Sequence, residues 1–282
     1  MRASLWMLGA IASFCLMAVS ARELDGHIDK FELLAIRSAV GIILLVVIMN
    51  VIKRPTLMFT KRMNAHLGRN FFHFIGQFCW LVGIGLLPLA EVFAIEFTVP
   101  LWVLILASLF LGEAITKRKA LSVALGLLGV VVILKPGLQD IDQGAIVMLI
   151  AAFSFAITFI MTKSLLNTEH PLTIVFYMTL IQLPLSAFMA GADWSMPKPW
   201  MWPFVMAVAL TGLSGHYCLS KAFQQADVSL VISVDFLRLP LIALIGVWLY
   251  NEPLQVSIIF GGLLMLLANL ANHWRVKWPT WL

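Results

Sequence analysis

Two segments of this chain match each other: GQFCWLVGIGLLPLAEVFAIEFTVPLWVLILASLFLGE at residues 76–113 and GHYCLSKAFQQADVSLVISVDFLRLPLIALIGVWLYNE at residues 215–252. At the offset that places Glu113 on Glu252, the identical pairs include Gly76 with Gly215, Cys79 with Cys218, Val92 with Val231, and Phe97 with Phe236. The acid Glu96 falls on the acid Asp235. Few positions are identical, but the offset is close to half of the 282 residues, so the pattern predicts two copies of one unit.

The composition of the chain is typical of a membrane protein. Hydrophobic residues make up 61% of the sequence, charged residues 12%, and the mean hydropathy is +0.97, whereas a soluble domain is about one quarter charged. Ten apolar runs are each roughly 18–24 residues long, which lets a helix cross about 30 Å of hydrocarbon. They lie at residues 4–21, 31–52, 70–87, 89–111, 118–135, 143–163, 171–190, 200–221, 227–250 and 254–272.

The ten runs divide into two units of five, at residues 4–135 and 143–272. Because five is an odd number, the second unit enters the membrane from the opposite side to the first. Inverted repeats of this kind recur in secondary transporters. The expected fold class is therefore an all-α integral membrane protein with ten transmembrane helices in two inverted five-helix repeats.

Basic residues between the runs predict the orientation. If the N-terminus is cytoplasmic, the inside segments carry 13 lysines and arginines and the outside segments carry 4. The inside set is Arg2, Lys53, Arg54, Lys61, Arg62, Arg69, Lys117, Arg118, Lys119, Lys163, Lys221, Arg275 and Lys277, and the outside set is Arg22, Lys30, Lys135 and Lys198. We therefore predict a multi-pass protein of the inner (plasma) membrane with both termini in the cytoplasm. The net charge of +5 reflects this topology and gives no reason to expect nucleic-acid binding.

The first run can also be interpreted as a signal peptide, because Arg2 precedes it and small residues at 18–21 follow it. The repeat favours its retention. Moving the run 143–163 back by the repeat offset places it on 4–24, so removal of the first run would leave the sixth without a partner.

Four groups of residues carry a resemblance to a known family. They are Phe31-Glu32 to Arg37, Pro88 to Pro100 with Leu111-Gly112-Glu113, Gly126 to Pro136, and Lys221-Ala222-Phe223 to Asn251-Glu252-Pro253. With them, nearly the whole chain resembles the EamA family of the drug/metabolite transporter superfamily. The resemblance implies a ten-helix bundle that moves small metabolites by alternating access. Within the family, the start of the second run and Lys135-Pro136 are most similar to S-adenosylmethionine carriers. The resemblance also leaves open a homodimer that forms through the fifth helix of each unit.

Ionisable residues inside the apolar runs are the candidates for a substrate-binding or coupling site, because each costs about 2.5–3.5 kcal/mol to insert. They are Glu96, Asp235, Arg238, Arg37, Glu91, His216 and His73. Glu96 and Asp235 occupy equivalent places in the two units. Inversion would bring them toward the pseudo-twofold axis near the middle of the membrane.

Structural roles stay open for most of these residues. Asp235 and Arg238 are three apart and can neutralise each other on one helix, and Arg37 can extend to the outer interface. Glu91 follows Pro88 closely and can also lie at an interface. Glu96 has no basic partner on its own helix, which makes it the strongest candidate. Glu113 and Glu252 end their runs, so we expect them to be helix-end residues.

Aromatic and amide side chains on nearby runs suit a planar or cationic substrate. They are Trp80, Gln77, Tyr217, Phe223 and Trp248. A cation such as a sulfonium gains from an aromatic face and a carboxylate. The expected substrate is a small polar or cationic metabolite, with an amino acid, a nucleoside-like compound or a vitamin-like compound as alternatives.

Pro100 and Pro240 lie deep in the fourth and ninth runs, one residue out of repeat register. Each removes a backbone hydrogen bond and can bend its helix. We therefore expect them to act as hinges. Prolines are also common in membrane helices without any such role.

Two other functional classes stay open. Gly212-Leu213-Ser214-Gly215 matches the GxSG string of rhomboid-type intramembrane serine proteases, but a nucleophilic serine needs a histidine base within reach, and His216 follows on the same helix. A channel or a structural membrane protein is the second alternative. The sequence has no P-loop and no metal-ligand or dinucleotide motif. No catalytic residue, metal or cofactor is therefore expected, and a proton or substrate gradient is the expected driving force.

Overall fold

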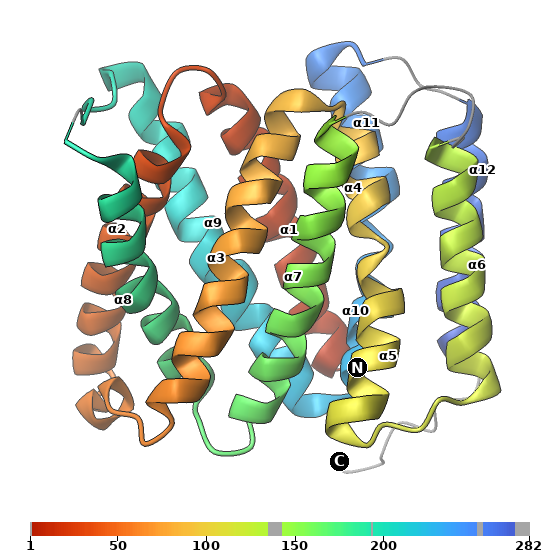
Figure 1. Cartoon of the computed structure of the whole chain (residues 1–282), viewed down its shortest axis with the longest axis horizontal. Helices are drawn as coiled ribbons and strands as arrows, with labels where there is room; N and C mark the ends of the chain where they lie inside the picture. The colour runs from red at the N-terminus through yellow and green to blue at the C-terminus, as the bar shows by residue number, and fades with distance from the viewer. Residues whose placement is uncertain (1, 135–142, 193, 253–255, 274–282) are drawn as a thin grey trace.

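The computed structural model describes residues 2–134, 143–192, 194–252 and 256–273, and all regular structure in these ranges is helical (Figure 1). The helices are α1 (Arg2–Leu24), α2 (Lys30–Val51), α3 (Met63–Leu86), α4 (Leu89–Glu96), α5 (Val99–Leu111), α6 (Lys117–Leu134), α7 (Gln143–Leu165), α8 (Pro171–Ala190), α9 (Trp202–Gln225), α10 (Val228–Asp235), α11 (Arg238–Tyr250) and α12 (Val256–His273), with 3₁₀ turns η1 (Pro55–Met58) and η2 (Pro199–Met201). A helix satisfies its backbone polar groups internally, which lipid requires.

Five segments of the described chain are long and apolar enough to cross a membrane. They are Ala3–Leu24, Lys30–Val51, Leu89–Leu111, Gln143–Leu165 and Pro171–Ala190. The helices α3 and α9 have 24 residues each but carry many buried polar side chains. The helical, membrane-spanning character is therefore clear, and the full count of ten spans stays a prediction.

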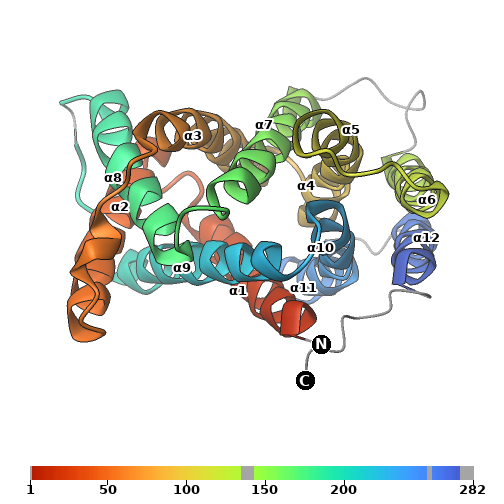
Figure 2. The same cartoon turned by 90° about the horizontal axis from the view of Figure 1, so that it is seen from below.

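Four pairs of helices lie side by side in the bundle (Figures 1 and 2): α1 with α9, α3 with α7, α2 with α8, and α6 with α12. If each helix is replaced by its equivalent in the other half, the pair α1 with α9 becomes α7 with α3. The pairs α2 with α8 and α6 with α12 stay the same. The pair α6 and α12 forms one edge of the bundle (Figure 2).

Two glycines from the sequence match explain how closely the long pairs approach. A Cβ atom on Gly76 in α3 would lie 2.9 Å from the ring of Phe155 in α7. A Cβ atom on Gly215 in α9 would lie 2.6 Å from the ring of Phe14 in α1. The two glycines are related by the repeat offset, and the two phenylalanines by nearly the same offset. The two halves therefore use the same close contact, in which glycine leaves room for an aromatic ring.

The sequence suggested one continuous helix for each of the runs 89–111 and 227–250, but neither run is continuous. Each is divided in two, at residues 97–98 and at residues 236–237. Both breaks lie just before a proline, Pro100 in α5 and Pro240 in α11, whose ring crowds the carbonyl four residues earlier. Tighter hydrogen bonds over three residues carry the chain through, such as the amide of Thr98 donating to the carbonyl of Ile95 at 3.0 Å.

Candidate functional site

A small cavity lies between the two halves of the chain at these breaks. Its walls come from α1, α3, α4, α7, α9, α10 and α11. Six of the predicted site residues line it: Gln77, Trp80, Glu96, His216, Asp235 and Arg238. Its volume of about 30 Å³ holds one or two water molecules, far less than the roughly 300 Å³ of a typical small-molecule pocket. This central cavity is therefore contracted in the present conformation.

Three charged residues form its polar wall. Arg238 begins α11, and its guanidinium lies 2.7 Å from Oε1 of Glu96 and 2.5 Å from Oδ2 of Asp235. All three residues are buried in the bundle. Glu96 ends α4 and Asp235 ends α10, so the helix breaks bring the equivalent acids of both halves to one arginine.

The second oxygens of the two acids differ. Oε2 of Glu96 accepts a hydrogen bond from Nε1 of Trp80 at 2.9 Å. Oδ1 of Asp235 is buried and has no hydrogen-bond partner among the residues that the structure describes, and the same holds for Oε1 of Gln77. Two carboxylates share one guanidinium, so this group carries a net charge of −1 when both carboxylates are ionised, and it leaves acceptor atoms available.

Aromatic rings complete the cavity. The guanidinium of Arg238 lies 4.8 Å from the ring centroid of Phe93 and 5.3 Å from that of Phe14. Phe14, Phe155 and Phe159 line the cavity together with Trp80. The site therefore combines an excess negative charge with aromatic faces, which favours a cation with a planar or apolar part.

Other predicted residues lie elsewhere. Tyr217 lines a separate, mostly apolar cavity of about 760 Å³ between α2, α8 and α9. Trp248 is 84% exposed, so its expected role in the substrate site is wrong. Phe223 is fully buried in the apolar core, and Glu91 is half-buried in the first turn of α4, outside the central cavity. Asp235 and Arg238 do form an ion pair, and Arg238 also contacts Glu96 from the other half.

A polar stripe on α3 was only partly recognised from the sequence. It consists of His66, Arg69, Asn70, His73 and Gln77, all buried. The charge count places Arg69 in a loop, but it is 2% exposed inside the bundle. Without it, the inside segments carry 12 basic residues and the outside segments 4. The spacing of the stripe matches one helix face, which is the signal that could have revealed it.

Hydrogen bonds join the stripe to the central cavity. Nε2 of His73 lies 3.0 Å from Nε2 of His216, which lines the cavity. Nδ1 of His73 lies 2.6 Å from the amide nitrogen of Gln182 in α8. Arg69 donates to the side-chain oxygens of Asn70 at 2.6 Å and Thr162 at 3.2 Å.

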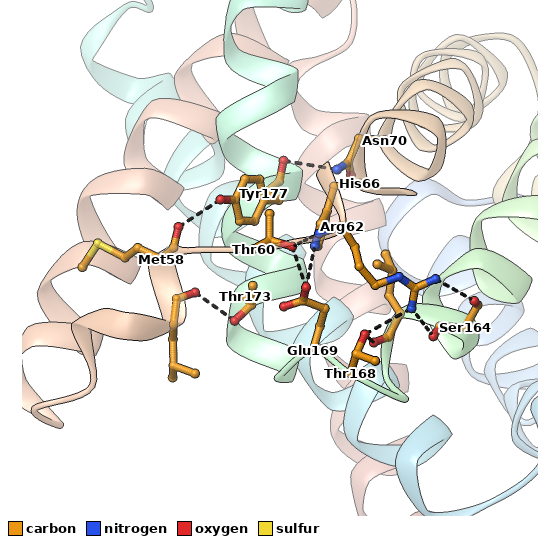
Figure 3. A network of polar contacts seen from close by, with 12 residues as sticks. Met58, Thr60, Arg62, His66, Asn70, Ser164, Thr168, Glu169, Thr173 and Tyr177 are labelled. Atoms are coloured by element: carbon orange, nitrogen blue, oxygen red, sulfur yellow. Dashed lines mark hydrogen bonds and ion pairs between the residues drawn. The ribbon is translucent and has the colours of Figure 1, made fainter. Parts of the chain in front are cut away.

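A network of polar contacts closes the end of the bundle at which α3 begins (Figure 3). Arg62 donates to the carbonyl of Ser164 at 2.8 Å, and Thr60 lies 2.5 Å from a carboxylate oxygen of Glu169. The hydroxyl of Tyr177 donates to the carbonyl of Met58 at 3.0 Å. These contacts join the segment before α3 to α7 and α8. They connect residues that are far apart along the chain, so sequence reasoning did not find them.

Glu113 and Glu252 lie two residues beyond the ends of α5 and α11, and each contacts another helix. The carboxylate of Glu252 accepts from the amide of Leu89, the first residue of α4, at 3.0 and 3.1 Å. The carboxylate of Glu113 accepts from the amide of Val228, the first residue of α10, at 3.1 Å. The repeat offset relates Glu113 to Glu252 and Leu89 to Val228. Each acid therefore stabilises the positive end of a helix from the other half.

A basic residue accompanies each acid. Arg22 in α1 donates to the carbonyl of Leu87 at 2.6 Å, and Lys163 in α7 donates to the carbonyl of Ala226 at 2.9 Å. We call the contacts around Glu252 and Arg22 the upper latch, and those around Glu113 and Lys163 the lower latch. They lie at opposite ends of the bundle (Figure 1). Both are formed at once, in agreement with the contracted cavity.

The serine of the GxSG string has partners other than a histidine. Oγ of Ser214 lies 2.9 Å from Oγ of Ser13 and 3.3 Å from the carbonyl of Thr211. Among the hydrogen bonds of the described residues, His216 instead pairs with His73. The geometry of a serine nucleophile with its base is therefore not formed.

Comparison with known proteins places the chain in a family. The profile of the EamA-like transporter family matches residues 1–135 and 142–271. The chain belongs to the EamA-like transporter family. This membership makes it a transporter and disfavours the protease, channel and purely structural alternatives. One solved crystal structure has a TM-score of 0.75 over 96% of both chains at 16% identity, which shows the fold alone.

Three relatives that are named as transporters or exporters are similar over most of their length. An S-adenosylmethionine uptake transporter of Rickettsia bellii is 26% identical, with 94% of this chain and 91% of the relative covered. A riboflavin transporter of Vibrio cholerae is 26% identical, with 98% and 95% covered. A pseudopaline exporter of Pseudomonas aeruginosa is 24% identical, with 94% of each covered.

Proposed function

We propose that this chain is a ten-span carrier of two inverted repeats, 4–135 and 143–272, that binds its substrate at the central cavity and opens to one side at a time. The single observation that carries the proposal is the cluster of Glu96, Asp235 and Arg238, which both halves build between the two latches. Release of one latch at a time would expose the cavity to one face. Pro100 and Pro240, beside the helix breaks, are the proposed hinges.

The proposed substrate is a small polar or cationic metabolite with a planar part. The excess negative charge favours a cation, and the rings of Trp80, Phe155 and Phe159 favour a flat or apolar moiety. The relatives named for S-adenosylmethionine and riboflavin support this class, because both compounds contain fused heteroaromatic rings and the first is also a cation.

Uptake into proteoliposomes tests the function. The purified chain, reconstituted into lipid vesicles, should accumulate radiolabelled S-adenosylmethionine or riboflavin in a saturable manner. Saturation separates a carrier from a channel. A variant with both Glu96→Gln and Asp235→Asn should lose uptake by at least tenfold at equal protein content, and full uptake by that variant would overturn the proposed site.

We further propose that a proton drives transport. Two acids share one arginine, so a proton and a cationic substrate can compete for the second carboxylate. Within the described chain, Oδ1 of Asp235 has no hydrogen-bond partner. An imposed pH gradient should increase the initial uptake rate severalfold in the parent protein, and Asp235→Asn should abolish the increase. Equal rates with and without the gradient would instead support exchange or a substrate gradient.

The proposed location is the inner membrane with both termini in the cytoplasm. The excess of basic residues at the end where α1 begins supports this orientation. In right-side-out vesicles, a protease-cleavable tag placed before Arg2 should stay protected until the vesicles are opened. Cleavage in sealed vesicles would reverse the orientation.

A homodimer would form through the edge of α6 and α12. This edge exposes large apolar side chains, among them Leu121, Leu128, Ile259, Phe260 and Leu263. Lipid can cover such a surface as well as a second copy can. Light scattering of the chain in nanodiscs should give two copies per disc, and charged substitutions of Leu128 and Phe260 should reduce this to one.

A further inference from the structure

Arg37 is a buried cation that has no partner in the described part of the chain. It lies in α2 and is 1% exposed, and none of its three guanidinium nitrogens has a hydrogen-bond partner among the described residues. The alternative that it extends to the membrane interface is therefore wrong. An isolated buried charge costs several kcal/mol, so a structural role alone does not explain an arginine here.

A second buried arginine adds to this charge. Arg69 is 2% exposed, and its partners Asn70 and Thr162 are neutral. Within the part of the chain that the structure describes, no carboxylate lies within 4.0 Å of either guanidinium. Two buried acids, Glu96 and Asp235, lie at the central cavity with Arg238 instead. The two arginines therefore form a positive region without a counter-ion.

Arg37 and Arg69 do not line the central cavity, but their positions beside α9 and on α3 bring them close to it. The guanidinium of Arg37 lies against Gly212 in α9, where a Cβ atom would be 2.7 Å from its Nε. One turn further along α9, which is about 5.4 Å, His216 lines the cavity. His216 also contacts His73 on the same face of α3 as Arg69. An extended substrate in the cavity can therefore direct one group towards Arg37.

We propose that Arg37, with Arg69, is the subsite for a carboxylate of the substrate. The proposal rests on the proposed function and narrows it to zwitterions whose charges are several bonds apart. The cationic group would lie beside Glu96 and Asp235, and the carboxylate beside Arg37, whose planar fork can bind both carboxylate oxygens. The substrate would then neutralise both unpaired regions at once, and compounds with only one of the two charges would bind more weakly.

Paired ligands that differ in one carboxylate test the subsite. The pairs are S-adenosylmethionine with decarboxylated S-adenosylmethionine, and lysine with cadaverine, and riboflavin is the ligand without a carboxylate. Dissociation constants are measured by calorimetry for the full chain in nanodiscs. The variants are Arg37→Gln, Arg37→Lys and the control Arg54→Gln, which removes an exposed positive charge beyond the end of the same helix.

The parent protein and Arg54→Gln should bind the carboxylated member of at least one pair tenfold or more tighter. Arg37→Gln should lose this preference through weaker binding of the carboxylated member alone, and Arg37→Lys should keep part of it. The ligand-free Arg37→Gln protein should melt at the same temperature or higher, because an unpaired buried charge has been removed. If Arg37 were needed only for folding, Arg37→Gln would lower the melting temperature.

Three outcomes would overturn the carboxylate subsite: equal affinity within both pairs, a preference that Arg37→Gln retains, or binding of riboflavin alone. In each of these the proposed carrier function still stands, because a ligand binds. Absence of binding and uptake for every compound would overturn the proposed function itself and the subsite with it.

Discussion

Arg238 is the residue on which the charge balance of the central cavity depends, because it is shared by Glu96 and Asp235. Removal of one partner of a buried ion pair costs about 3–5 kcal/mol, since an unpaired charge stays behind. Arg238→Gln should therefore destabilise the protein by about that amount, measured by chemical unfolding in detergent. The variant that also carries Glu96→Gln should recover part of the loss, because only one carboxylate then stays ionised.

The control for this prediction is Arg54→Gln at an exposed position, which should change stability by less than about 0.5 kcal/mol. If Arg238→Gln unfolds no more easily than this control, the three residues do not form the coupled group described above.

His170 gives the protein a local sensitivity to acid. Its Nδ1 accepts a hydrogen bond from the amide of Leu172 at 3.1 Å and so caps α8, which requires the neutral ring. Burial lowers the pKa of His170 in the folded protein, and the nearby Lys221 and Arg54 lower it further. As pH falls below about 6.5, the unfolded chain binds the proton before the folded chain does. Stability should therefore fall with falling pH in this range and be unaffected by this group at higher pH.

The melting temperature from pH 8 to pH 5 checks this. The parent protein should lose stability towards acid more steeply than His170→Asn, whose side chain can still cap the helix without titrating. Parallel profiles for the two proteins would show that His170 does not contribute.

At the scale of helices, the proposed mechanism assigns the two latches the role of holding the cavity closed. Each acid binds the amide end of a helix from the other half, and a hydrogen bond to a charged group contributes about 1.5–3 kcal/mol. Glu252→Ala and Glu113→Ala should each lower stability by about that amount. Glu252→Gln and Glu113→Gln, which keep an acceptor oxygen, should lose less than half of it. Chemical unfolding of the four variants gives the comparison.

The initial rate of uptake separates the latches from ordinary structural contacts. Each alanine variant should favour the conformation that is open at the end of its broken latch. The apparent affinity for substrate added at one given face should therefore change in opposite directions in the two variants. Equal changes from both sides would mean that the latches only stabilise the fold.

The helices could be predicted from hydropathy, because a backbone in lipid must satisfy its hydrogen bonds internally. The matched glycines and the paired acids Glu96 and Asp235 could also be predicted, since both follow from the repeat. The breaks after Glu96 and Asp235 could not, because a proline indicates a bend without fixing where the helix stops. The partners of Glu252 and Arg62 could not either, because they lie in distant parts of the chain.

At the scale of the whole molecule, the symmetry between the halves explains how one cavity can serve two faces. The upper and lower latches use equivalent residues, and equivalent helix pairs carry them. Inversion then places one latch at each end of the bundle. The present conformation has both latches closed. In the proposed mechanism, two further conformations, each with one latch open, would complete the cycle.

Access to the central cavity tests this account most directly. Met17 lines the cavity and is 5% exposed, so Met17→Cys is placed in a chain whose Cys15, Cys79 and Cys218 are replaced by serine. A membrane-impermeant thiol reagent is then applied to either face of oriented vesicles. Labelling should occur from both faces, with Glu252→Ala favouring the face of the upper latch and Glu113→Ala the face of the lower latch. Labelling from one face only, whichever latch is broken, would contradict alternating access through this cavity.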